Sequence, residues 1–258
     1  MPAHIVSLSS YPVKGLSALS HERVAVVAGE GFPGDRIFGF AKGNSGFDPA
    51  NPHPLPKSRF LALYGYEALA RLDTAIDPNT LNMRITEREG ANHYFDLSRA
   101  EGEAKATAFL NTLLALDADE YPVFATAAPH RFTDVSVTST QMMHAISLIN
   151  LASVRAFGEA IGADVDPARF RGNILIDGWP PFAELDLVGQ RIQLGGLDFE
   201  VLKRTKRCPA TQVNPDTAER DLDVPRLIKQ HYGHADMGIY IEALTGGGLH
   251  CGDTASHP

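Results

Sequence analysis

Short stretches rich in Ile, Val and Leu, separated by turn residues, dominate the hydrophobic pattern of the chain. Such stretches are typical of β-strands, and they occur at residues 3–8, 23–28, 36–41, 81–87, 173–177, 191–194, 197–203 and 237–244. Gly195-Gly196, between two of them, is a typical hairpin turn. Because the strands do not alternate regularly with long helices, the pattern disfavours a doubly wound parallel sheet. It favours an α+β fold rich in β-barrel structure, with a few peripheral helices.

Three segments have the spacing of helices. Ser98 to Glu101 fits a capping box, and apolar residues follow at helical spacing up to Leu116. A second helix is predicted from Asn150 to Ile161, with Gly162 as its C-terminal cap. A short third helix is predicted over residues 222–230.

Residues 42–57 are rich in Gly, Asn and Pro and predict a loop. A loop of this length in a compact domain is functional or mobile. A domain boundary is predicted near residues 118–122, which divides the chain into residues 1–120 and 121–258. The sequence contains no internal repeat and no low-complexity segment.

Composition narrows the class of protein. The 258 residues are 44% hydrophobic and 21% charged, with a formal net charge of -8, which is typical of a soluble globular protein and argues against a nucleic-acid partner. Two cysteines are too few for a disulfide framework or an iron–sulfur cluster. The sequence has no evident signal peptide and no run of about 18 apolar residues. We therefore predict a cytoplasmic protein without a membrane partner.

The densest cluster of chemically active residues is KRTKRCP at 203–209. Its four cations surround Cys208, and nearby positive charge stabilises a thiolate, which is both a nucleophile and a soft metal ligand. A buried structural cysteine beside a solvated basic run is the alternative.

Two weaker candidates lie near the C-terminus. His231 and His234, with His250 and Cys251, could be imagined as a zinc site, but no carboxylate or CxxC spacing supports it. Gly246 to Gly248 lacks the Lys and Ser or Thr of a phosphate loop.

Several motifs in sequence order resemble those of the MOSC domain, named after the C-terminal part of molybdenum cofactor sulfurase. They are FRGNILID at 170–177, Arg207-Cys208, VNPDT at 213–217, GIY at 238–240 and LHCGD at 249–253. Upstream, YPVK at 11–14 and GDR at 34–36 resemble the β-barrel domain that precedes MOSC in amidoxime-reducing proteins. The resemblance covers nearly the whole chain and implies that residues 1–120 are this N-terminal MOSC-type β-barrel domain and residues 121–258 the MOSC domain.

The resemblance implies a site for molybdenum cofactor, a molybdopterin carrying molybdenum. Cys208 matches the position of the molybdenum ligand and catalytic residue, and thiolate ligation suits a metal already bound by sulfur. The positions that contact the cofactor in relatives correspond to Lys14, Arg36, Arg171, Asn173, Lys206 and Arg207. Arginine suits this role because its planar fork donates two parallel hydrogen bonds to phosphate or pterin oxygens. Without the resemblance, these residues read as loop charges and turn caps.

The sequence departs from the family pattern at four places. Gly15 stands where many relatives have serine, Asn214 where aspartate is usual, and Ala218 where glycine is usual. The segment from Thr138 to His144 matches poorly. None of these departures removes the proposed metal ligand.

Three functions remain open at this stage. The first is a molybdenum-dependent oxidoreductase that reduces N-hydroxylated compounds such as amidoximes and hydroxylamines. It would need an external electron donor of the ferredoxin, flavoprotein or cytochrome type, because the chain has neither iron–sulfur cysteines nor a dinucleotide fingerprint. The second is a carrier or binding protein for molybdenum cofactor or sulfur, without turnover. The third is a cysteine hydrolase, which needs a histidine base near Cys208.

Overall fold

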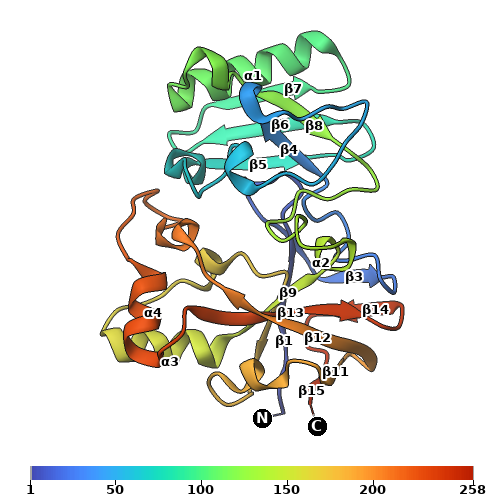
Figure 1. Ribbon diagram of the computed structural model, residues 1–258, viewed down its shortest axis with the longest axis vertical. Coiled ribbons are helices and arrows are strands. Elements are labelled where there is room, and N and C mark those ends of the chain that lie inside the picture. Colours follow the sequence, from blue (N-terminus) through green and yellow to red (C-terminus); the bar gives the residue numbers. More distant parts are fainter. Residues whose placement is uncertain (1, 258) are drawn as a thin grey trace.

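The computed structural model describes residues 2–257 and has two units stacked along its long axis (Figure 1). The small unit contains one long helix and the strands packed beneath it. The large unit contains a curled eight-stranded sheet, two helices on its outer face and both chain ends. This architecture confirms the α+β, barrel-rich fold class.

The small unit is built from β4 (Phe38–Ala41), β5 (Leu72–Ile76), β6 (Asn82–Glu87), β7 (Asn92–Asp96), α1 (Ala100–Leu114) and β8 (Val123–Thr126). Strands β5, β6 and β7 form one antiparallel sheet, and β4 pairs with β8. Its core is a cluster of buried aliphatic and aromatic side chains that includes Phe40, Leu69, Ile85 and Leu110.

The order of the large sheet is β15-β11-β12-β13-β9-β10-β1-β2. These strands are β1 (His4–Ser10), β2 (Leu19–His21), β9 (Ile146–Asn150), β10 (Ile174–Asp177), β11 (Arg191–Leu194), β12 (Leu197–Lys206), β13 (Asp236–Ala243) and β15 (Ala255–Ser256). Strands β3 (Arg23–Val26) and β14 (Gly247–His250) form a separate antiparallel ribbon.

The large sheet curls until its two ends meet. The Ala255 N–H donates to the Ala3 carbonyl (2.8 Å), and the Ile5 N–H donates to the Asp253 carbonyl (2.8 Å). The segment around β15 therefore closes onto the start of β1, and a cluster of aliphatic side chains and Phe199 fills the interior. Closure leaves few unpaired strand edges in this unit.

Strand β9 is buried along its whole length, because both faces of the sheet are covered there. Ile146 and Leu148 point to the interior cluster, whereas Ile149 packs under α3 (Leu151–Ile161) and α4 (Val224–Tyr232). Helix α3 begins at the Asn150 cap and ends at Gly162 in the left-handed conformation, as predicted. Helix α4 begins two residues later than predicted.

The remaining helical elements are short. They are η1 (Gly43–Ser45), η2 (Lys57–Arg59), η3 (Glu67–Arg71), η4 (Ala118–Glu120), α2 (Thr140–Met143), η5 (Pro167–Phe170), η6 (Ala183–Leu187) and η7 (Pro209–Gln212). The predicted loop at residues 42–57 contains η1 and leads into η2. It is held to η4 by the Lys42–Glu120 ion pair (3.0 Å).

One local prediction is wrong. The capping box at Ser98 does not form: the Ser98 hydroxyl donates to the Asp96 carboxylate, and helix α1 starts after Arg99. Trp179, which precedes two prolines, is only 4% exposed. Its indole N–H donates to the Ala255 carbonyl (3.2 Å), so it packs against the closure of the large sheet.

The predicted division into residues 1–120 and 121–258 stays a prediction, but the strand pairing does not follow it. Strand β1 pairs with β10 and β3 pairs with β14, so these strands belong to the large unit although they precede residue 120. Between β1 and β2 the chain already touches the small unit, because Val13 and Leu16 pack in its core. Within residues 2–257, no helix is long and apolar enough to cross a membrane.

Candidate functional site

A cavity of about 200 Å³ lies where the strand ends of the large unit face the small unit. All seven residues singled out from the sequence line it: Lys14, Arg36, Arg171, Asn173, Lys206, Arg207 and Cys208. We call it the cationic cavity. The structure thus brings together residues up to 194 positions apart in the chain, while their roles stay a prediction.

Cys208 stands at the end of strand β12, where Pro209 begins η7 and stops the strand. Its side chain is partly exposed to the cavity and forms no disulfide. The Cys208 sulfur contacts the Lys57 side chain, and the Cys208 carbonyl accepts from the Thr211 hydroxyl (2.9 Å). The sulfur is therefore presented at the wall of the cavity by a strand end with fixed backbone.

Lys14 is a buried cation, 3% exposed, that forms an ion pair with Asp134 and donates to the Phe132 carbonyl (2.8 Å). Loss of hydration lowers the pKa of Lys14, and Asp134 opposes that effect. Burial would raise the pKa of Asp134, but Lys14 and Lys57 outweigh it and hold that pKa well below its usual range. Asp134 is therefore ionised, and its single charge is shared by two lysines.

Lys57 reaches the cavity from the end of the long loop in the small unit. Its ammonium lies 3.6 Å from the Asp134 carboxylate and 5.4 Å from the centre of the Tyr64 ring. Burial lowers the pKa of Lys57, but the charges of Asp134 and of the Cys208 sulfur outweigh it, so the net pKa is raised. The cation beside the Cys208 thiol is thus Lys57 of the small unit, whereas Cys208 itself belongs to the large unit.

Tyr11 contacts two arginines of the cavity. The Arg171 and Arg36 guanidinium carbons are 4.1 Å and 4.8 Å from the centre of its ring. Each contact is a cation–π interaction, which attracts the cation to the ring. Arg36 also pairs with Asp35 (2.5 Å), whose other oxygen accepts from the Tyr11 N–H (2.8 Å).

Arg207 is fixed by backbone carbonyls instead of a carboxylate. It donates to Met237 (2.8 and 2.5 Å) and Phe170 (2.9 Å), and burial lowers its pKa to about 10. Burial lowers the pKa of Arg171 to about 10 as well. Both groups stay protonated at neutral pH, so the cavity holds positive charge that costs desolvation free energy.

The charge of the cavity is not balanced from within the protein. Among residues 2–257, no carboxylate lies within 4 Å of Arg171, Arg207, Lys203 or Lys206. Three polar atoms in its wall are buried without a hydrogen-bond partner in the described part of the chain: Ser147 Oγ, Thr205 Oγ1 and Arg169 Nε. Buried polar atoms in proteins normally have hydrogen-bond partners. The unpartnered polar atoms and the cations without a carboxylate therefore fit a bound group that is anionic and forms hydrogen bonds.

Asn173 differs from the other predicted contacts, because its amide is used inside the protein. Its Oδ1 accepts from the Ser147 N–H (3.0 Å), and its Nδ2 donates to the Ser9 carbonyl (3.1 Å). It joins β1, β9 and the start of β10 beneath the cavity. Lys206 is exposed at the rim, and Arg204 turns away to Asp186 (2.9 Å), so only part of the basic run faces the thiol.

Residues 129–256 match the family model of the MOSC domain. The chain contains a MOSC domain. Its matched region begins with the loop that carries Asp134 and ends in β15, and it includes Cys208, Arg171 and Arg207.

The MOSC domain is also similar to part of several curated proteins. The chain is 37% identical over 98 residues to molybdenum cofactor sulfurase of Caenorhabditis briggsae and 38% identical over 98 residues to that of Drosophila grimshawi. These matches cover 36% and 38% of the chain. They cover only 14% and 12% of the two sulfurases, so most of each relative has no counterpart in the match.

Solved structures with low similarity include the YuaD protein from Bacillus subtilis and YiiM from Geobacillus stearothermophilus. The first is 13% identical with a TM-score of 0.44, covering 99% of this chain and 94% of that one. The second is 19% identical with a TM-score of 0.35, covering 44% and 53% of the two chains.

The structure explains two departures of this MOSC protein from the family pattern, and at a third it explains the residue that is usual in the family. At Gly15 φ is +82°, and an added Cβ would lie 2.7 Å from the Leu61 carbonyl oxygen, so a serine does not fit. Ala218 has φ +59°, a conformation that favours the usual glycine. Asn214 accepts from the Asp216 N–H (2.8 Å) and donates to Asp221 (2.6 Å), which an aspartate could not do.

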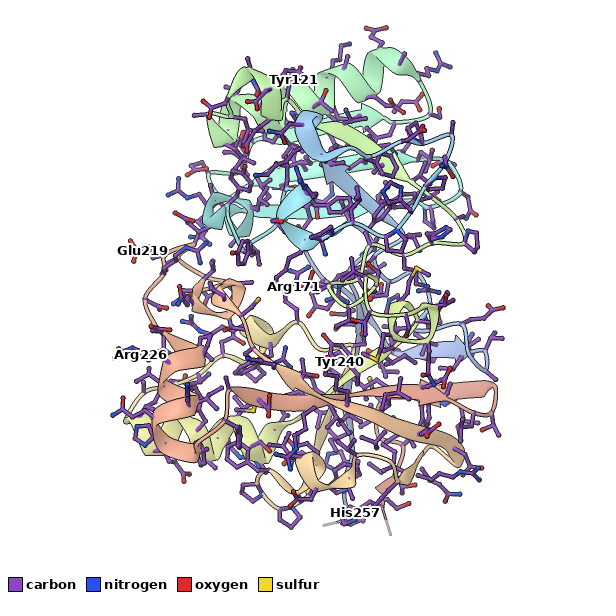
Figure 2. The ribbon with its side chains drawn as sticks, viewed as in Figure 1. Tyr121, Arg171, Glu219, Arg226, Tyr240 and His257 are labelled. Atoms are coloured by element: carbon purple, nitrogen blue, oxygen red, sulfur yellow. The ribbon has the colours of Figure 1, made fainter. Side chains whose placement is uncertain are left out.

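Sequence reasoning missed several residues of the cavity wall, among them Lys57, Asp134, Ser147, Arg169 and Tyr240. Tyr240 lies on β13 and faces the gap between the units, with Arg171 above it (Figure 2). Tyr240 belongs to the GIY motif at residues 238–240, so that motif was a signal for this wall residue. Lys57 ends a proline-rich loop, and Asp134 lies in a segment without periodicity, so neither gave a signal.

Two alternatives find no support in the geometry. No histidine of the described chain lines the cationic cavity, so a histidine base for a Cys208 hydrolase is missing. The weaker zinc candidate of His231, His234, His250 and Cys251 does not assemble either. In residues 2–257 no three His, Cys, Asp or Glu side chains gather into a metal site.

The unbalanced charge predicts that multivalent anions stabilise the cofactor-free protein. Pyrophosphate at about 100 times its dissociation constant should add about 2.7 kcal/mol, which corresponds to a rise in Tm of roughly 5–10 °C. Differential scanning fluorimetry measures the shift, with chloride at equal ionic strength as the control. Equal shifts with pyrophosphate and chloride would contradict a built anion site.

Proposed function

We propose that the cationic cavity binds molybdenum cofactor and that the protein reduces N-hydroxylated compounds such as amidoximes and hydroxylamines. The observation that carries the proposal is the meeting of the Cys208 sulfur with cations that have no carboxylate partner, in a protein of net charge -8. The names of the sulfurase relatives support a link to this cofactor.

The residues of the cavity fit the group. Cys208 offers the soft sulfur ligand that molybdenum takes. The guanidinium groups of Arg171 and Arg207 suit phosphate and pterin oxygens, and Ser147 and Thr205 offer buried hydroxyls that lack partners. Bound there, the cofactor would supply a redox-active metal that exchanges two electrons with the substrate.

In this proposal, the chain's own residues bind and orient the cofactor and the substrate. The reaction R–NHOH + 2e⁻ + 2H⁺ → R–NH₂ + H₂O breaks the N–O bond, so the site must admit water and protons next to Cys208. The ionised Asp134, 42% exposed, and the Lys57 ammonium lie at that place and keep it polar and hydrated. The electrons come from a separate donor of the ferredoxin, flavoprotein or cytochrome type.

The test is a measurement of molybdenum and of oxidised-pterin fluorescence on protein purified from a host that makes the cofactor. We expect near-stoichiometric amounts of both and reduction of benzamidoxime with reduced methyl viologen as electron source. Absence of molybdenum and pterin, from a host that loads a control enzyme, would overturn the proposal.

The sulfurase names favour a second candidate, a carrier of molybdenum cofactor or sulfur without turnover. Loaded protein that reduces no N-hydroxylated compound but transfers its cofactor to an apo-enzyme would establish the carrier and exclude the reductase. Turnover with the artificial electron source decides for the reductase.

A further inference from the structure

A second cavity of about 390 Å³ lies between the two units beside the cationic cavity. The two share Gly15, Leu63, Arg169 and Arg171 in their walls, and Arg171 lies in the gap between the units in Figure 2. Its volume is within the range of small-molecule sites. Cys208 does not line it, so the proposed function assigns it no role.

One side of the second cavity is apolar. Leu16, Leu69, Leu72 and Val213 contribute to its wall, and all four side chains are at most 5% exposed. They come from three separate segments. Leu16 lies between β1 and β2, Leu69 and Leu72 lie in η3 and β5 of the small unit, and Val213 follows η7. Because Leu16, Leu69 and Leu72 belong to the packed core of the small unit, this wall is preformed. Such a surface favours the apolar body of an organic ligand.

The other side carries an excess of cations. Arg71, Arg88, Arg169 and Arg171 line the second cavity, against Asp73 and Glu87. Both carboxylates have partners of their own: Asp73 pairs with Arg84 (3.3 Å) and Glu87 contacts His93 (2.7 Å). In the described residues, no carboxylate lies within 4 Å of Arg71, Arg88 or Arg171.

Arg169 and Arg171 stand where the two cavities meet. The Arg169 side chain is 4% exposed, pairs with Asp221 (2.8 Å) and donates to the Gln212 carbonyl (3.1 Å), which leaves its Nε without a partner among residues 2–257. Arg171, two residues on, donates to the Leu16 carbonyl (2.7 Å) and stacks on Tyr11, which leaves further N–H donors. A buried donor of this kind is normally satisfied.

We propose that the second cavity binds an amphipathic organic anion. Its apolar body lies on Leu16, Leu69 and Leu72, and its carboxylate, sulfonate or phosphate lies at Arg169 and Arg171. The second cavity does not include Cys208, so the proposal goes beyond the proposed function, but it shares Arg171 with the proposed cofactor contacts.

The test uses the full chain and a fluorescent amphipathic sulfonate, 8-anilinonaphthalene-1-sulfonate. We expect one saturable site per chain and a binding constant at least about tenfold larger than that of the neutral N-phenyl-1-naphthylamine, because a paired charge in a partly buried site is worth about 1.4 kcal/mol or more. Equal affinity for both probes would overturn the anionic part of the proposal.

Variants at exposed wall positions locate the site. Ala18→Trp should fill the mouth of the second cavity and Arg71→Glu should reverse one charge, each weakening sulfonate binding about tenfold or more. Arg191→Glu, an exposed arginine on β11 outside both cavities, is the matched control and should bind like wild type. Ala168→Trp repeats the test from another exposed wall position if Ala18→Trp does not fold.

The pterin content of the same variants separates this proposal from the proposed function. Ala18→Trp should lose the sulfonate and keep the wild-type pterin content. Loss of both would mean that the second cavity is part of the cofactor site and would overturn the separate site. Wild-type protein that binds sulfonate but carries no pterin would refute the proposed function and leave this site standing.

Discussion

Cys208→Ser is expected to lose molybdenum and all reductase activity while keeping the wild-type fold. A serine hydroxyl is a harder and less acidic ligand than a thiolate, so it does not replace sulfur on this metal. Changes outside the ligand shell typically cost about 10- to 100-fold in metal affinity, and loss of the ligand itself should cost at least as much. Molybdenum content per chain, measured on variant and wild type from the same host, checks the prediction.

The second cysteine provides a matched control. Cys251 packs against the interior of the large sheet and lies near the His21 carbonyl (3.5 Å), away from the cationic cavity. Cys251→Ser should retain molybdenum and activity. Retention of full metal content in Cys208→Ser, or equal loss in both variants, would refute Cys208 as the ligand.

Gly238→Ala is expected to destabilise the protein and to weaken anion binding at the same time. Gly238 has φ +74°, and an added Cβ would overlap the Leu148 carbonyl oxygen and lie 2.6 Å from the Ile149 side chain. The left-handed conformation costs about 1–2 kcal/mol and the overlap about 1–3 more. The neighbouring Met237 carbonyl holds Arg207, so its displacement should also release that cation.

Gly233→Ala isolates the conformational part of this cost. Gly233 has φ +77° at the end of α4, and an added Cβ there meets no atom within 4 Å. Its cost should be only about 1–2 kcal/mol. Urea unfolding gives both free energies, and the Tm shift with pyrophosphate gives the anion affinity. A Gly238 variant no worse than the Gly233 variant would show that β9 and β13 can separate without loss.

Local pattern was sufficient for much of the fold. The strand at residues 191–194, the hairpin at Gly195-Gly196 and helix α3 with its C-terminal cap Gly162 follow from propensity, turn chemistry and helical spacing alone. These features depend on contacts within a few residues. Strand β9 was missed for the opposite reason: its run from Ile146 to Ile149 leads directly into an apolar helix, and periodicity cannot separate a buried strand from such a helix.

The same distinction holds at the site. The KRTKRCP run indicated Cys208, and ordered short motifs indicated the six proposed cofactor contacts, because each motif is readable in one place. The partners of those residues come from elsewhere. Lys57 and Asp134 are 77 residues apart in the sequence, and neither lies in a motif. Their meeting at the cavity depends on how the small unit sits on the large one.

The sequence by itself determined the class of fold, the candidate metal-binding sulfur and the set of cations near it, since these are properties of residue type and local order. Only the tertiary structure decided which charges stay unpaired. Asp35, Asp186 and Asp221 take up Arg36, Arg204 and Arg169, whereas Arg171 and Arg207 receive only backbone carbonyls and aromatic rings. The net charge of a cavity depends on residues from segments that are distant in sequence. It is therefore fixed only when the chain has folded.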